Sequence, residues 1–339
     1  MKDIPNNFYN LDIYGKSSKR PYNSRGKMFG YHTLGFGSGV AGGQLPTQRA
    51  ILGFGAVASG GAATGITNLI NSSGVIAADT SAVGTARISV AAANYGGDKA
   101  IFMGGYAGSS GYGLSNLVNA SGVVGSDVSA VADNVTSHYG VKFGVGLAGF
   151  FYGEITGDTS YSNNKSLVSN LGVVASTVDG AGTGRQSGPG TSYGGDKAIY
   201  YTGRISANTF INESNLISNT GVQSADVTGV GLEKAFGAGA SYGEDKGIFA
   251  FGFSEAQNSN LNFSNTISNV GVVSSDVDGV GTARRALSAS GYGADKAIFM
   301  KGTSDQTNLV NNQGVVQSDT NGVGTARYYS GAAGFSNTA

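Results

Sequence analysis

The stretch SDVDGVGTARRALSASGYGADKAIFMKG, from Ser275 to Gly302, decides the fold because related copies of it recur along the chain. Two of them are TSAVGTARISVAAANYGGDKAIFMGG, from Thr80 to Gly105, and GLEKAFGAGASYGEDKGIFAFG, from Gly231 to Gly252. Chemistry is usually carried out at a single place in a protein, whereas architecture is repeated. We therefore interpret the charged residues in this stretch as parts of a scaffold.

Two independent anchors set a repeat period near 50 residues. The anchor lysines are Lys99, Lys197, Lys246 and Lys296. Their separations are 98, 49 and 50 residues, so the first gap contains a degenerate copy, near Leu147 to Gly153. Arg49 stands 50 residues before the first lysine. The Gly-Val pairs give the same count and begin at Gly74, Gly122, Gly172, Gly221, Gly271 and Gly314. Six units therefore fill the chain from about Arg49 to its end.

The composition narrows the class of protein. Glycine provides 58 of the 339 residues, more than twice its usual share of roughly 7%. The chain has no cysteine, which excludes disulfides and thiolate metal sites. Its net charge is zero, so no basic surface points to nucleic acid. The N-terminus lacks the apolar segment of a signal peptide and no run of 18 apolar residues occurs, so we expect a soluble protein without membrane insertion.

One unit, from Lys246 to Tyr292, predicts four short strands. KGIFAFGF reads as a strand, SEAQNSNLNF as a loop, SNTIS and GVVSSD as two further strands, and TARRALSASGY as a longer strand of small residues. Four strands in each of six units predict an all-β fold, a β-propeller of six four-stranded blades with the small-residue strand innermost. A β-solenoid is the alternative.

The two ends of the repeat predict how the propeller closes. The last small-residue strand, Gly324 to Phe335, has nothing after it, whereas the first unit begins at Arg49 with its second strand. Pairing of these N- and C-terminal strands would remove two exposed sheet edges. In the alternative, Gly26 to Gly39 supplies the missing strand and the C-terminal strand begins a seventh blade.

The order of strands from Thr85 to Val124, TAR…DKAIFMGG…SNLVN…GVV, resembles kelch-type propellers. Only Gly104-Gly105 keeps the glycine doublet of that family, and the chain has no Trp. A closer likeness, over about 290 residues from Arg49 onward, is to kelch-like repeats in structural proteins of tailed bacteriophages. The resemblance implies the fold more strongly than a function, because propellers serve many functions.

The repeated charged residues are interpreted as inter-blade contacts. The cations recur on the innermost strand and are Arg87, Arg185, Lys234, Arg284 and Arg327. We expect them to bridge blades by binding carbonyl groups or the repeated Asp79, Asp127, Asp226, Asp276 and Asp319. Lining a channel that attracts anions is the alternative. The Asp-Lys pairs that precede each second strand are expected to be polar hairpin turns.

No catalytic residue, metal site or cofactor is expected. DVDG at Asp276 to Gly279 begins like a calcium loop, but the later acidic ligands are missing. His32 and His138 have no recognisable triad partner.

The N-terminal residues 1–24 differ from the propeller expected over residues 25–339. They are basic, aromatic and unrepeated, which favours an attachment arm for a partner; a disordered tail is the alternative. The residues expected to attach are Phe8, Tyr9, Tyr14, Lys16, Lys19 and Arg20.

The sequence therefore predicts a non-enzymatic virion structural protein of a tailed phage, an adaptor or receptor-contact module in the tail, a fibre or the capsid surface. Its expected partners are other virion proteins and a host surface glycan or receptor, with several copies in each particle. The alternative is a cellular carbohydrate- or protein-binding propeller, located in the cytoplasm or exported to the cell surface without a signal peptide. Glycan binding predicts aromatic platforms on variable loops, and the loose candidates are Tyr106, Tyr112, Tyr161 and Phe210.

Overall fold

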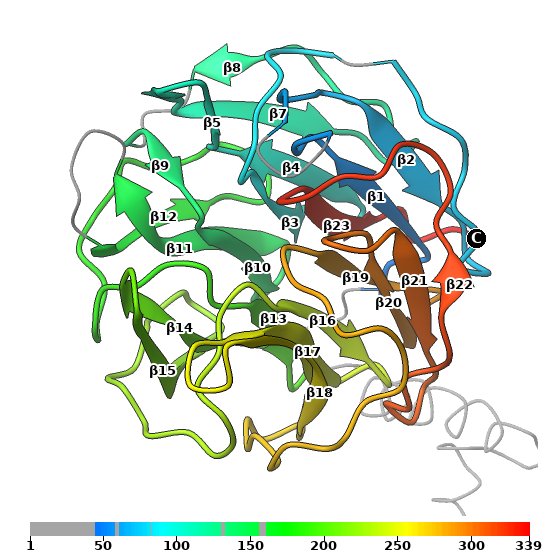
Figure 1. Ribbon diagram of the computed structural model, residues 1–339. Coiled ribbons are helices and arrows are strands. Elements are labelled where there is room, and N and C mark those ends of the chain that lie inside the picture. Colours follow the sequence, from blue (N-terminus) through cyan, green and yellow to red (C-terminus); the bar gives the residue numbers. More distant parts are fainter. Residues whose placement is uncertain (1–44, 58–60, 82, 130–132, 156–160) are drawn as a thin grey trace, which may run out of the picture. The chain divides into compact units, whose positions relative to one another are not determined.

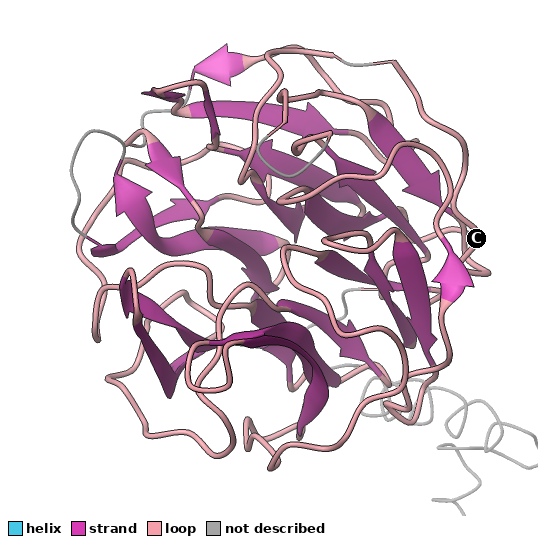
Figure 2. Cartoon of the chain, viewed as in Figure 1, coloured by secondary structure: helices cyan, strands magenta, loops and turns pink. Residues whose placement is uncertain are grey.

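The described part of the chain is built from β-strands alone. The computed structural model describes residues 45–57, 61–81, 83–129, 133–155 and 161–339, and every regular element within them is a strand (Figure 2). The predicted all-β class is therefore confirmed. No helical segment of membrane-spanning length and hydropathy occurs in these ranges. The predicted boundary between residues 24 and 25 lies outside them.

Six antiparallel sheets follow one another along the chain (Figure 1). The first contains β2 (Thr67–Ile70), β1 (Arg49–Gly53) and β23 (Gly331–Phe335), and the second contains β3 (Ala91–Tyr95), β4 (Lys99–Met103), β7 (Leu114–Val118) and β8 (Val128–Ser129). The third contains β10 (Tyr139–Phe143), β11 (Leu147–Ile155) and β12 (Tyr161–Val168), with β9 (Val135–Thr136) paired to β11. The fourth contains β13 (Gly190–Tyr193), β14 (Lys197–Ser206) and β15 (Thr209–Ile217). The fifth contains β16 (Ala238–Tyr242), β17 (Lys246–Ser254) and β18 (Ser259–Ile267), and the sixth contains β19 (Ser288–Tyr292), β20 (Lys296–Met300), β21 (Gln306–Val310) and β22 (Thr320–Asn321). A small hairpin of β5 (Tyr106–Ala107) and β6 (Ser110–Gly111) stands apart.

One small-residue strand of each sheet, here called its lead strand, contacts the lead strands of two other sheets. The contacts run in the order β3, β10, β13, β16, β19 and β23, and β23 contacts β3 again. Small residues allow this approach. A Cβ added to Gly140 would lie 2.4 Å from the carbonyl oxygen of Ala92 on β3, and one added to Gly239 would lie 2.7 Å from that of Gly190 on β13. Side chains at these positions would push the lead strands apart.

The two ends of the repeated region pair as expected. β1 and β23 are antiparallel neighbours, with Arg49 opposite Phe335 and Gly53 opposite Gly331. The first sheet therefore joins segments from the beginning and the end of the repeated region. Residues 26–39, which would supply this strand in the seven-blade alternative, lie outside the described residues.

The same kind of glycine-aromatic contact recurs between each sheet and the next. The glycine of every Gly-Val pair has a positive φ, and a Cβ there would meet an aromatic ring that ends the lead strand of the preceding sheet. The six pairs are Gly74 with Tyr292, Gly122 with Phe335, Gly172 with Tyr95, Gly221 with Phe143, Gly271 with Tyr193 and Gly314 with Tyr242. The periodic glycine is therefore a packing requirement between sheets as well as a turn residue.

Two predicted features of the unit from Lys246 to Tyr292 were wrong. The segment SEAQNSNLNF is mostly strand, because β18 begins at Ser259 after a tight turn. The predicted strand GVVSSD forms only one isolated bridge, between Val273 and Ile267. The amide of Val272 instead bonds to the hydroxyl of Ser268 at 3.1 Å, and such side-chain bonds favour a turn over a sheet ladder.

The predicted long strand TARRALSASGY is also interrupted. Only Ser288–Tyr292 is strand, because Ala286 has a φ of 61° and breaks the extended backbone. The same break occurs before every lead strand and creates the site described next.

Candidate functional site

The predicted cations lie between sheets, and Arg87 shows the arrangement. Its carbonyl oxygen accepts the amide of Gly55 in the first sheet at 2.8 Å. Its fully buried guanidinium donates to Asn116 Oδ1 of the second sheet and lies 4.0 Å from Asp127 Oδ1. The guanidinium also stands 4.7 Å from the ring centroid of Phe54 in the first sheet. Arg87 therefore holds two neighbouring sheets with its backbone and its side chain.

The repeated aspartates complete this contact. Asp127 accepts hydrogen bonds from the amide of Thr85 at 2.9 Å, from its hydroxyl at 2.7 Å and from Asn116 Nδ2 at 2.9 Å. Burial alone raises the pKa of Asp127, but the bonds from Thr85 and Asn116 and the charge of Arg87 outweigh it, so the pKa lies below its ordinary value. Equivalent sets contain Arg185 with Asp226, Lys234 with Asp276, Arg284 with Asp319 and Arg327 with Asp79.

Burial lowers the pKa of several of these cations, but they stay charged and remain engaged in contacts within the protein. It lowers the pKa of Arg87 and of Arg284 to about 10, against the opposing charges of Asp127 and Asp319. Both groups keep their positive charge at neutral pH. Both guanidinium groups bond within the sheet of their own lead strand and lie over a ring of the preceding sheet, which is Phe54 for Arg87 and Phe251 for Arg284, so they are inter-sheet contacts.

The third sheet replaces the whole charged set with uncharged residues. Val135 stands where the other sheets have Arg or Lys, and the hydroxyls of Ser166 and Thr177 lie 3.3 Å apart at the Asn and Asp positions. A cavity of about 10 Å³ remains beside Val135, and His138 also lines it. The imidazole of His138 fills the space above Gly104, where an added Cβ would lie 2.3 Å from it. Burial lowers the pKa of His138 to about 3, so the side chain is neutral.

The Asp-Lys pairs form polar turns at the hairpins. The Nζ to Oδ1 distances are between 2.7 and 3.2 Å, and the lysine side chains are 40–45% exposed. These pairs are Asp98-Lys99, Asp196-Lys197, Asp245-Lys246 and Asp295-Lys296.

A belt of six left-handed residues precedes the lead strands. Their φ angles lie between 54° and 63°, and the belt consists of Ser89, Ser137, Ser187, Phe236, Ala286 and Tyr329. Five backbone hydrogen bonds link them in series. The amide of Ser89 donates to the carbonyl of Tyr329 at 3.0 Å, and the series continues through Ala286, Phe236 and Ser187 to Ser137. Such strained backbone persists because the surrounding hydrogen bonds fix it.

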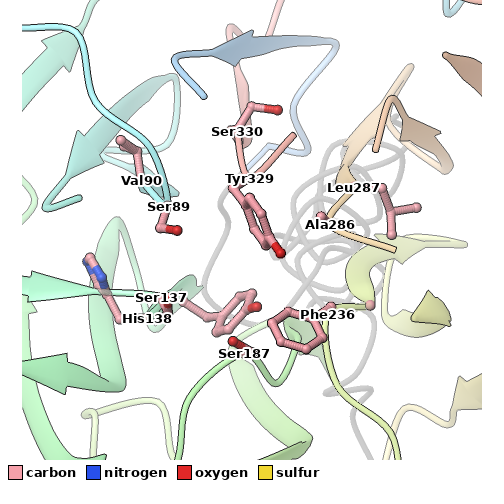
Figure 3. Close-up of a pocket in the computed structure, with 12 residues that line it drawn as sticks. Ser89, Val90, Ser137, His138, Ser187, Phe236, Ala286, Leu287, Tyr329 and Ser330 are labelled. Atoms are coloured by element: carbon pink, nitrogen blue, oxygen red, sulfur yellow. The ribbon is translucent and has the colours of Figure 1, made fainter. Parts of the chain in front are cut away.

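The belt surrounds a cavity of about 50 Å³ that we call the mouth. Its lining includes Ser89, Ser137 and Ser187, which carry hydroxyls, and the aromatic residues Tyr139, Phe236 and Tyr329. Figure 3 shows both rings turned toward the cavity and the imidazole of His138 turned away from it. The mouth therefore offers hydroxyl groups together with aromatic rings.

Two arginines and further rings adjoin the aromatic side of the mouth. The guanidinium carbon of Arg204 stands 5.0 Å from the ring centroid of Phe236 and 5.9 Å from that of Tyr161. That of Arg285 stands 4.4 Å from the ring of Phe253. Burial raises the pKa of Tyr329, and the charges of Arg285 and Arg204 oppose this shift only in part. Half-buried aromatic and guanidinium groups together bind planar or hydroxylated ligands well.

The sequence interpretation did not find most of this site. Of its four aromatic candidates, only Tyr161 contacts one of the mouth arginines, and Phe210 is buried beneath Phe236 and Phe253, with centroid distances of 6.2 Å. The sequence signal for this site was a difference between the units at the belt position. Three units carry Ser at the belt position, and the other three carry Phe236, Ala286 and Tyr329.

A second surface carries exposed apolar side chains at repeated positions. The valine of every Gly-Val pair is 54–65% exposed, and these residues, here called the rim valines, are Val75, Val123, Val173, Val222, Val272 and Val315. Leu171 and Val270, two residues before rim valines, are 77% and 71% exposed. The protein therefore presents one apolar group per sheet at equivalent turns.

The predicted attachment residues of the arm, including Phe8 and Lys16, lie outside the described residues. Across the ranges that the structure describes, no three His, Asp or Glu residues gather as a metal site would require. No protein-family model matches the chain, and no curated protein matches its sequence.

Proposed function

We propose that the chain is a non-enzymatic structural protein of a tailed-phage particle. In this proposal residues 45–339 are a six-bladed kelch-like β-propeller, which serves as an adaptor or receptor-contact module in the tail, a fibre or the capsid surface. The virion is its location, and other virion proteins are its partners.

The circular order of contacts supports the propeller. The lead strands contact one another in a series that returns to β3, and all six line one cavity of about 70 Å³. The six glycine-aromatic contacts have the same geometry at every step, including the step from Tyr292 to Gly74 between the sixth and the first sheet. Pairing of β1 with β23 gives the first sheet a lead strand like those of the other five sheets, so β1 has no free edge.

The rim valines are the observation that carries the adaptor function. Six equivalent valines are more than half exposed, although valine in a folded domain is usually buried. Apolar groups repeated on a surface gain free energy when a partner covers them, at about 25 cal/mol per Å². A protein surface with matching apolar positions fits this arrangement, as expected for assembly within a particle.

Particle incorporation tests the adaptor function. We expect the wild-type protein in purified particles at a fixed copy number. The variant Val222→Ser/Val272→Ser/Val315→Ser should keep its melting temperature, because these side chains are exposed, and should lose incorporation. Lys197→Ser, at an exposed hairpin, is the matched control and should incorporate normally. Absence of the wild-type protein from particles would reject the virion function.

The N-terminal arm is the second proposed contact. Phe8, Tyr9 and Tyr14 carry apolar surface, and Lys16 and Lys19 can orient an acidic partner. Removal of residues 1–24 should leave the melting temperature of the propeller nearly unchanged and abolish incorporation. Normal incorporation of the truncated protein would assign attachment to the rim valines alone.

The mouth supports a second candidate function, the carbohydrate- or protein-binding propeller. Sugars bind between aromatic faces and planar hydrogen-bonding groups, and the mouth brings Phe236 and Tyr329 beside Arg204. A glycan array probed with the wild-type protein and with Phe236→Ala tests this function. Binding that is lost in the variant supports it, and binding that the variant retains excludes the mouth.

A further inference from the structure

A single lysine lies in the cavity that the six lead strands line. At one level of this cavity each lead strand contributes one residue, and this level consists of Asn94, Lys142, Ser192, Ser241, Gly291 and Gly334. Lys142 is the only titratable residue among those that line the cavity. The volume of about 70 Å³ is several times the 10–15 Å³ that one water molecule needs.

No described residue compensates the charge of Lys142. Its Nζ forms neither an ion pair nor a hydrogen bond with any residue in the described ranges. Glu244 lines an adjoining cavity of about 40 Å³ together with Lys142, but no ion pair joins them. Burial lowers the pKa of Lys142, and no neighbouring charge opposes this shift. Lys142 is partly buried and has no described counter-ion, so an anion in the cavity would be stabilised beside its charge.

Hydroxyl groups accompany this charge. Thr191 is buried, lines the same cavity and has a hydroxyl oxygen without a hydrogen-bond partner. Ser241 and Ser290 line the cavity from β16 and β19. The amide of Asn94 already donates to the carbonyls of Lys99 and Gly334. The hydroxyl of Ser290 donates to the carbonyl of Gly291 at 3.1 Å, and that of Ser192 to the carbonyl of Lys142 at 2.9 Å, so the hydroxyls of Thr191 and Ser241 are the available donors.

We infer that this cavity binds a small oxyanion of the phosphate or carboxylate class, with Lys142 as its counter-ion and the hydroxyls of Thr191 and Ser241 as hydrogen-bond donors. The inference does not depend on the proposed virion function, because Lys142, Thr191 and Ser241 belong neither to the rim valines nor to the lining of the mouth. Charge-assisted hydrogen bonds to an oxyanion are stronger than neutral ones, which favours this class over an uncharged ligand.

Thermal unfolding of the full chain at constant ionic strength tests the inference. Replacing chloride by phosphate, and separately by acetate, should raise the melting temperature of the wild-type protein with a saturable concentration dependence. Lys142→Met should fold and should weaken the apparent affinity for the anion at least about tenfold, because the cavity loses its cation. Lys197→Met, which removes an exposed hairpin lysine, should respond like the wild type.

Thr191→Val keeps the shape of the side chain and provides a second variant if Lys142→Met does not fold. It should weaken anion stabilisation while the arginines of the inter-sheet contacts remain intact. A shift that is equal in wild type and both variants would assign the anion to another site and overturn the inference. So would a wild-type protein that neither phosphate nor acetate stabilises.

Discussion

Single residues with positive φ explain the periodic glycines of this chain. Gly271 has a φ of 87°, and an added Cβ would lie 2.9 Å from the ring of Tyr193. Gly108 has a φ of 61°, but nothing lies within 4 Å of an added Cβ. Both positions disfavour a side chain for backbone reasons, and only Gly271 also lacks the space for one.

These two glycines provide a matched prediction. Gly271→Ala should reduce the free energy of unfolding by about 2–4 kcal/mol, because left-handed strain and steric overlap add together. Gly108→Ala should cost only about 1 kcal/mol, from strain alone. Urea unfolding measures both values. Equal costs would contradict the role of Gly271 as a packing position between sheets.

His138 predicts a pH dependence of stability. Its pKa is about 3 in the folded protein and 6.5 ordinarily, so between these values the unfolded chain binds a proton that the folded protein does not. The free energy of unfolding should therefore fall as the pH decreases from about 6.5 toward 3, by about 1.4 kcal/mol per pH unit for this group. Unfolding of wild type and His138→Gln between pH 7 and 4.5 measures this slope. An unchanged slope in the variant would show that His138 is not responsible.

Among the elements, two kinds of ion pair occur in the sixth unit. Arg284 is buried, donates to the carbonyl of Lys301 at 3.0 Å and stands 4.0 Å from the ring centroid of Phe251. The pair Asp295-Lys296 is at a hairpin and half-exposed. Burial decides how much each pair contributes to stability. Water screens the charges of an exposed pair, whereas a buried charge that loses its partner has no water to compensate it.

We expect Arg284→Val to destabilise the protein by about 3 kcal/mol, because it leaves Asp319 without its cation and the carbonyl of Lys301 without its donor. The triple variant Arg284→Val/Asn308→Ser/Asp319→Thr copies the natural set of the third sheet and should be more stable than the single variant. Denaturant unfolding compares them. A triple variant less stable than the single one would show that each residue contributes separately.

Replacing Asp295 and Lys296 together by Ser should change the free energy of unfolding by less than about 1 kcal/mol. The same denaturant experiment measures this value, and ligand binding should be retained. A folded variant that has lost all binding would make the hairpin a functional site.

The whole molecule depends on the pairing of β1 with β23. The C-terminal segment supplies a lead strand, the belt residue Tyr329 and the buried Arg327, which donates to Asn68 of the first sheet. The C-terminal segment therefore joins the two ends of the repeated region by strand pairing, by the belt and by a buried side-chain hydrogen bond.

Truncation after Val323 tests this dependence. Loss of β23 exposes β1 and the neighbouring lead strands, so the truncated protein should aggregate or melt far below the wild type. Thermal melting and size-exclusion chromatography measure the effect. An unchanged melting temperature would favour closure by residues 26–39.

The sequence by itself determined the all-β class and the six units, because repetition displays the same local pattern six times. It favoured the pairing of the terminal strands and left the seven-blade alternative open. It also marked the cations and aspartates as a repeated set. The lengths of the hairpins were predicted less well, because strands with polar side chains, such as β18, extend beyond the core. The fourth strands were also predicted less well, because local bonds from side chains to the backbone replace pairing in the sheet.

Only the tertiary structure decided where the candidate sites lie. Phe236, Tyr329 and Arg204 are far apart in the sequence from Ser89, and they meet because every unit delivers its belt residue to the same place. Lys142 belongs to a degenerate unit, and its isolation became visible only when six lead strands enclosed one cavity. The repeat shows in the sequence which positions are equivalent. The candidate sites depend on residues that differ from the repeat, such as Phe236 and Lys142. The neighbours of these residues come from other units, so only the folded chain shows them.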